Sequence, residues 1–73
     1  MLTKLYEHGK NRIYHHPDGY LVIETDNGHT DHAYFREFQS DGHVRFDAPE
    51  KIPTYLRHEV LKIFWKERKE SNV

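Results

Sequence analysis

The longest regular pattern of apolar and polar positions runs from Pro53 to Glu70. At about 100° per residue, apolar side chains recur within one arc of the width that a helix turns toward a core. They are Leu56, Val60, Ile63 and Phe64. Pro53 suits the first helical position, because it lacks an amide donor and restrains the preceding residue to an extended backbone. The pattern predicts one amphipathic helix over about residues 53–69.

Residues 1–50 consist of short apolar and aromatic segments separated by turn signals. The turns are Pro17-Asp18-Gly19, Asp26-Asn27-Gly28 and Ser40-Asp41-Gly42, with a weaker one at residues 8–11. Each contains a glycine that tolerates positive φ. The segments between them have strand length and composition: Leu2–Glu7, Arg12–His16, Tyr20–Thr25, His32–Gln39 and His43–Asp47. We therefore expect an antiparallel meander of four or five strands over about residues 2–47. With the C-terminal helix packed on one face, it forms a single α+β domain spanning residues 1–73.

Alternation along the expected strands sorts their side chains into two faces. One parity supplies the sheet's share of the predicted core: Leu5, Ile13, Leu21, Ile23, Val44 and Phe46. The opposite parity supplies an aromatic outer face that the helix does not cover: Tyr6, Arg12, Tyr14, His16, Tyr20 and Val22. Alternation assigns no face to Tyr34, Phe35, Arg36 and Phe38, because bulky residues there occupy both parities.

A second stripe of the helix carries the first candidate binding residues. Leu61 and Trp65 fall outside the core-facing arc, one turn apart, and Arg57 and Arg68 flank them. Tryptophan and arginine are common anchors of protein interfaces, so this stripe predicts contact with a protein partner. The alternative is that Trp65 packs over the sheet as a peripheral core residue.

If the alternative holds, the partner surface is expected on the outer face of the sheet. The tyrosines of that face are Tyr6, Tyr14 and Tyr20. Tyr14 and Tyr20 are therefore predicted as partner-binding residues in addition to those of the helix. A purely structural explanation is a cross-strand aromatic ladder that stabilises the exposed side of a thin sheet.

Length and composition restrict the class of protein. A chain of 73 residues has room for one core. It contains no cysteine, which favours a reducing compartment and the cytoplasm over a disulfide-stabilised secreted scaffold. Its apolar runs are too short for a signal core or a membrane span, so we expect no membrane association.

The net charge of −1 conceals an asymmetry between the two parts of the chain. Residues 1–50 carry five Lys and Arg against nine Asp and Glu, whereas residues 51–73 carry six against three. The sheet part therefore has a charge of −4 and the helix part +3. Either the two parts attract each other, or the charge asymmetry is related to the binding of a partner.

Seven histidines invite a metal-site interpretation, which the pattern does not support. Zinc needs three or four converging ligands, whereas His15 and His16 are neighbours on a strand and point to opposite faces. The acidic turn at residues 26–31 lacks the run of ligands that a calcium loop requires. The two serines show no triad order with His and Asp. We predict no metal, no cofactor and no enzymatic activity.

Nucleic acid is the main alternative partner. Tyrosines on an exposed sheet can stack on bases. A sheet that binds phosphates is expected to be basic, because counterion release supplies much of the affinity, and this one has a charge of −4. The sequence therefore favours a protein partner over nucleic acid, with a structural or assembly role as a third possibility.

In its general character the chain resembles the small phage proteins that bind host RNA polymerase as inhibitors or antiterminators. The resemblance rests on 73 cysteine-free residues, a meander punctuated by PDG, DNG and SDG, and the single terminal helix PTYLRHEVLKIFWKERKE. It involves no motif, so no residue acquires a role from it. It implies a stoichiometric binder in the host cytoplasm that occupies a surface of bacterial RNA polymerase and blocks initiation or alters termination.

Overall fold

A computed structural model describes residues 1–26, 28–39 and 43–71, and of residues 68–71 only the helical backbone. The elements are β1 (Thr3–His8), β2 (Asn11–His15), β3 (Leu21–Glu24), β4 (Thr30–Phe38), β5 (Val44–Asp47) and α1 (Thr54–Ser71). The strands form one antiparallel sheet in chain order, β1-β2-β3-β4-β5. The predicted α+β meander followed by one C-terminal helix is confirmed.

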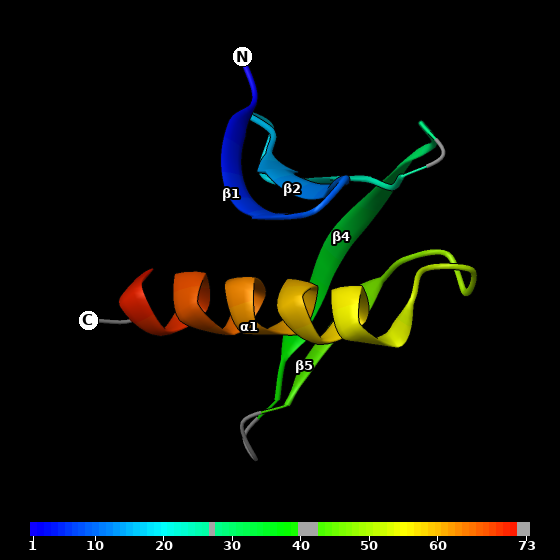
Figure 1. Cartoon of the computed structure of the whole chain (residues 1–73). Helices are drawn as coiled ribbons and strands as arrows, with labels where there is room; N and C mark the ends of the chain where they lie inside the picture. The colour runs from blue at the N-terminus through cyan, green and yellow to red at the C-terminus, as the bar shows by residue number, and fades with distance from the viewer. Residues whose placement is uncertain (27, 40–42, 72–73) are drawn as a thin grey trace.

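The longest strand, β4, pairs with a different neighbour along each half of its length. Residues 30–33 of this strand pair with β3, and residues 34–38 pair with β5 on its other edge. β4 therefore joins two parts of the sheet, and Tyr34 is the first residue beyond the β3 pairing. Figure 1 shows β4 running from the part that holds β1 and β2 to the part that holds β5, with α1 crossing it.

The turn between β2 and β3 shows how a short sequence sets the geometry of this sheet. Gly19 has a φ of 102°, and its amide donates to the carbonyl of His16 at 2.8 Å. The amide of His16 in turn donates to the carbonyl of Tyr20 at 2.9 Å. Pro17, with its φ fixed by the ring, and Gly19, which tolerates positive φ, suit a three-residue hairpin loop. The loop therefore sets His16 directly opposite Tyr20.

The core lies between α1 and the sheet. Phe64 of α1 is 1% exposed, and its ring centroid lies 5.8 Å from that of Phe35 and 5.7 Å from that of Phe46. The buried cluster comprises Ile13, Leu21, Ile23, Ala33, Val44, Ile52, Leu56, Val60 and Phe64. Most predicted core residues are among these, and Phe46 and Ile63 pack against them half-buried. Ala33 and Ile52 are additions that the sequence did not indicate.

A register shift in β1 corrects two predictions. Lys4 pairs with Tyr14 and Tyr6 pairs with Ile13, so Leu5 has no opposite residue. Such a bulge reverses the alternation of side chains along the strand. Leu5 was predicted in the core but is 44% exposed, whereas Tyr6 was predicted on the outer face but packs against the core.

A second shift explains why the middle of β4 could not be assigned. Phe35 pairs with Phe46 and Glu37 with Arg45, which leaves Arg36 as the extra residue. Phe38 then pairs with the buried Val44. Phe35 and Phe38 thus share the helix-facing side although their sequence positions differ by an odd number.

The ends of α1 differ slightly from the prediction. The helix begins at Thr54, because the carbonyl of Pro53 accepts hydrogen bonds from the amides of Leu56 and Arg57, each at 3.0 Å. Pro53 is therefore the capping residue and not the first helical residue. The helix continues to Ser71, two residues beyond the expected end. Nothing in the described part of the chain forms a helix long and apolar enough to cross a membrane.

Candidate functional site

The sheet face opposite α1 carries a cluster of aromatic and histidine rings, which we call the aromatic face. Its members are Tyr14, His16, Tyr20, His32 and Tyr34. The rings of His16 and Tyr20 stack with centroids 4.3 Å apart and an angle of 13°. Tyr20 also lies 5.0 Å from His32 and 5.1 Å from Tyr34. Residues from β4 and from both sides of the β2–β3 turn thus form one surface.

Val22 shows that this face has an apolar layer of its own. The side chain is only 8% exposed, yet it does not belong to the cluster beneath α1. Its cross-strand neighbours are Tyr14 on β2 and His32 on β4. Side chains directly opposite on one face lie within contact distance, so these rings shield Val22 from solvent.

Hydrogen bonds hold three of the rings in place. His32 Nδ1 lies 3.2 Å from the hydroxyl of Tyr34. The amide of Asp18 donates to His16 Nδ1 at 2.9 Å. A surface whose side chains are already ordered loses less conformational entropy when a partner binds. The aromatic face is therefore preorganised.

Tyr34 stands 41% exposed between two hollows, each of about 370 Å³. One is lined by Asp18, Gly19, Tyr20, Tyr34, Phe35 and Arg36. The other is lined by His32, Tyr34, Asp47, Ala48 and Pro49. Both are open to solvent, whereas small-molecule sites usually enclose most of their ligand. The geometry suits side chains presented by a larger partner.

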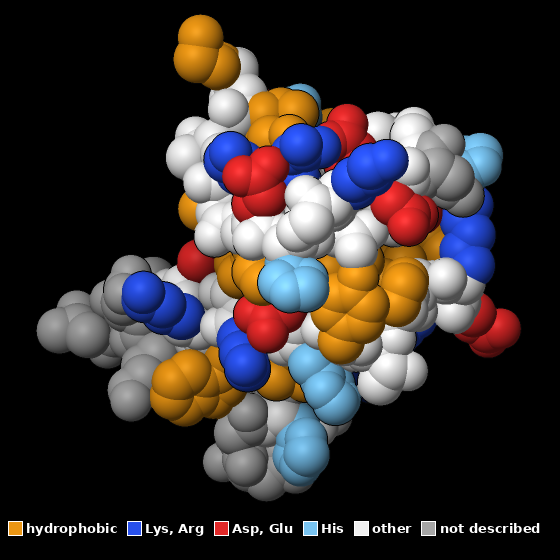
Figure 2. Space-filling view, viewed as in Figure 1, with side chains coloured by type: hydrophobic (Ala, Val, Ile, Leu, Met, Phe, Trp, Pro, Cys, Tyr) orange, Lys and Arg blue, Asp and Glu red, His pale blue; other side chains and the backbone are white. Residues whose placement is uncertain are grey.

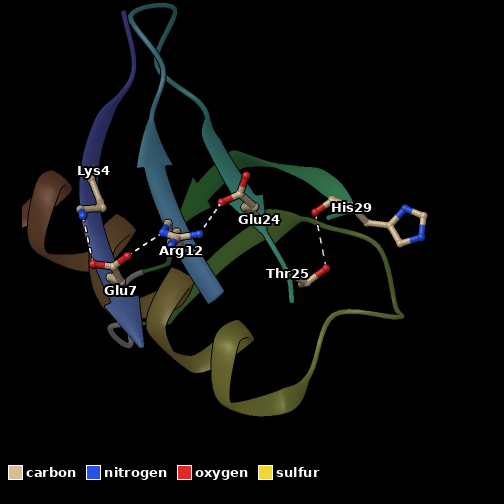
Figure 3. Close-up of polar contacts among 6 residues, drawn as sticks. All are labelled: Lys4, Glu7, Arg12, Glu24, Thr25 and His29. Atoms are coloured by element: carbon tan, nitrogen blue, oxygen red, sulfur yellow. Dashed lines mark hydrogen bonds and ion pairs between the residues drawn. The ribbon is translucent and has the colours of Figure 1, made fainter. Parts of the chain in front are cut away.

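A row of paired charges borders the aromatic face. Lys4 donates to Glu7 at 3.0 Å, and Arg12 donates to Glu7 at 2.6 Å and to Glu24 at 2.9 Å (Figure 3). The hydrogen bond from Lys4, followed by that from Arg12, lowers the pKa of the Glu7 carboxyl. The hydrogen bond to Glu7, followed by that to Glu24, raises the pKa of the Arg12 guanidinium. These cations are thus engaged with carboxylates of the same protein.

The view of Figure 2 shows the same mixture of charges on a larger scale. On this side of the molecule, Lys and Arg side chains lie interspersed with Asp and Glu and do not gather by sign. A protein that tracks a phosphate backbone usually presents a continuous basic patch. The visible face does not have that character.

The predicted stripe of α1 is partly used inside the domain. Leu61 and Trp65 are half-buried and pack against the core cluster. Arg57 donates to the carbonyl of Pro49 at 2.8 Å and so ties the helix to the segment that precedes it. The side chain of Arg68 lies outside the described residues. This arrangement favours the alternative in which Trp65 is a peripheral core residue.

Tyr14 and Tyr20 lie on the outer face, as predicted, but sequence reasoning did not identify His32 and Tyr34 as their neighbours. The signal that could have identified these neighbours was the turn between β3 and β4, where the amide of Thr25 donates to the carbonyl of His29 at 3.0 Å. Counting outward along the two strands from that pair places Val22 opposite His32, as the observed register does. The same count brings residue 20 beside residue 34.

A smaller polar hollow of about 220 Å³ lies next to the start of α1 and includes Asp26, Asp31 and Lys51 in its lining. The Asp31 side chain is 11% exposed and lies 3.6 Å from Lys51 Nζ. Its charge is therefore paired. Among the described residues, no three His, Asp or Glu side chains converge closely enough to hold a metal ion.

No protein-family model, curated protein or solved structure matches this chain. Its function is therefore inferred from its own geometry.

Proposed function

We propose that this protein is a non-catalytic regulator that binds a protein partner through the aromatic face. The observation that supports it is the group of ordered, partly exposed rings around Tyr20 and Tyr34, flanked by two open hollows. Tyrosine is enriched at the energetic centres of interfaces, because its ring offers a large contact area at low entropic cost. Such a protein acts by occupying a surface of its partner.

The resemblance to phage polymerase binders suggests which partner to test first. On this proposal the protein acts in the bacterial cytoplasm, and RNA polymerase is the candidate partner. Binding would inhibit initiation or modulate termination by occupying the polymerase surface.

Charge favours a protein over nucleic acid as the partner. Residues 1–50, which form the sheet, have a charge of −4, and Arg12 is held between Glu7 and Glu24. Stacking of bases on the aromatic face would bring phosphates toward this acidic part of the chain, where Arg12 and Arg36 are already paired with carboxylates. A protein surface imposes no such cost.

The aromatic face is also a better candidate than the α1 stripe. Leu61 and Trp65 already have part of their surface in contact with the core, so less apolar area remains for a partner. Tyr34 stands 41% exposed between hollows that contain no side chain of this protein.

The test is capture from a bacterial lysate, with and without nuclease treatment, followed by mass spectrometry and by titration with purified RNA polymerase. Three tagged proteins are compared: the wild type, Tyr34→Ala, and Tyr55→Ala as a matched control. Tyr55 is a similarly exposed tyrosine, 45% against 41%, but it lies on the first turn of α1. An interface anchor contributes about 2 kcal/mol or more, so Tyr34→Ala should weaken binding at least about thirtyfold.

The proposal would be supported if the wild type and Tyr55→Ala capture the same partner protein and Tyr34→Ala does not. Capture that disappears with nuclease would support the nucleic-acid alternative, and self-association alone would support a structural role. Equal retention by all three proteins would place the interface elsewhere.

A further inference from the structure

The hollow between the β2–β3 turn and β4 combines two aromatic rings with a carboxylate. The centroids of Tyr20 and Tyr34 lie 5.1 Å apart, with an angle of 38° between the rings. Asp18 lines the same hollow, and its side chain is 77% exposed. Aromatic faces and a carboxylate side by side form a surface that attracts cations.

The charges nearby leave Asp18 available to a ligand. The nearest imidazole is that of His16, whose Nδ1 lies 3.7 Å from Asp18 Oδ2. This nitrogen accepts a hydrogen bond from the Asp18 amide, and a ring nitrogen that accepts a hydrogen bond has no proton to donate to the carboxylate. The cation that lines the hollow is Arg36, and its guanidinium is paired with Asp47.

We propose that this hollow receives an arginine side chain from a basic segment of the partner, an inference that rests on the proposed function. The guanidinium would stack against Tyr20 and Tyr34 and donate hydrogen bonds to Asp18. Arginine fits better than lysine, because its planar group can stack on a ring while its edge donates to a carboxylate. The charge of −4 on the sheet part of the chain would attract such a segment.

The test uses the peptide acetyl-Gly-Arg-Gly-amide, with the uncharged citrulline peptide as control. Each is titrated into the ¹⁵N-labelled protein while backbone amide shifts are recorded. The arginine peptide should cause saturable shifts at residues 18–20 and 34–36. The citrulline peptide should bind more weakly, because it lacks the charge that both the rings and Asp18 recognise.

Substitutions separate the two recognition elements. An exposed cation–π contact corresponds to a change in affinity of about two- to fivefold. Tyr34→Leu should lose that factor, whereas Tyr34→Phe should retain most of the affinity because it keeps the ring. Asp18→Asn should weaken binding to a similar extent. Glu50→Gln removes a carboxylate that lies outside this hollow and should leave the affinity unchanged.

Equal binding of the two peptides, shifts confined to other residues, or no shift at all would overturn the arginine site. These results would leave the proposed function standing if Tyr34→Ala still lost the captured partner. An arginine peptide that binds as expected, while Tyr34→Ala keeps the partner, would retain the arginine site and reject the aromatic face as the main interface.

Discussion

Phe64 is the residue on which the packing of α1 most depends. It is the largest of the fully buried side chains, and its ring contacts Phe35 on β4 and Phe46 on β5. Replacing a buried phenylalanine with alanine typically costs about 3–5 kcal/mol. Each aromatic pair adds about 0.5–1.5 kcal/mol beyond the buried area, so the two lost pairs favour the upper part of that range.

This cost is large compared with the stability expected for the whole domain. At about 0.05–0.15 kcal/mol per residue, 73 residues give about 4–11 kcal/mol. Phe64→Ala should therefore remove a third or more of the free energy of unfolding, and at the lower limit it should unfold the protein at room temperature.

Urea denaturation followed by far-UV circular dichroism measures the effect. With a slope near 1 kcal/mol per molar urea, as expected for a small domain, the midpoint should fall by about 3 M or more. Lys62→Ala is the matched control on the same helix, because its side chain is 70% exposed and it should change stability by less than about 0.5 kcal/mol. A Phe64→Ala midpoint close to that of the control would show that α1 does not pack on the sheet through this face.

Three further predictions concern stability and metal binding. Trp65→Ala should lower the free energy of unfolding by about 1–3 kcal/mol in the same urea assay, which is less than the loss expected for a fully buried tryptophan, because the side chain is half-buried. An unchanged free energy of unfolding would indicate that Trp65 is an interface residue. Glu7→Gln should reduce the loss of stability on acidification from about pH 6 to pH 3. The folded pKa of the Glu7 carboxyl lies below 4.5, so its charge stabilises the fold at higher pH, and this contribution is lost as the pH falls through the folded pKa. A variant that remains as sensitive to acid as the wild type would contradict this prediction. EDTA should leave the melting temperature unchanged, because no three ligand side chains converge among the described residues, and a fall of several degrees would reveal a metal.

The architecture was predictable because its signals are local. The turn at residues 17–19 contains proline and glycine at the positions that its loop requires, and its hydrogen bonds follow from those residues. The apolar arc of α1 likewise identified Leu56, Val60 and Phe64 as buried. A meander needs only such local pairings, since each strand is followed along the chain by its neighbour in the sheet.

Alternation failed wherever a strand contains an extra residue. The bulge at Leu5 turned Tyr6 toward the core and left Leu5 exposed, and the bulge at Arg36 placed Phe35 and Phe38 on one side. Turn residues do not reveal a bulge, because its position depends on the packing of both strands. Tyr34 precedes the second bulge, so its exposure on the outer face could not be read from the alternation of its neighbours.

A structural role and a proposed binding role divide the aromatic face into two parts. Val22 lies outside the core beneath α1 but is almost fully buried, and its neighbours Tyr14 and His32 provide the cover that this requires. A cross-strand ladder that stabilises a thin sheet accounts for those two residues. It does not account for the exposure of Tyr34, which pairs with the exposed Asp47 on β5 and stands between two open hollows. Tyr34 is the first residue of β4 beyond the pairing with β3, and it lies exposed beside Tyr20. The residues that stabilise the outer face thus differ from the exposed tyrosine that we propose to contact a partner.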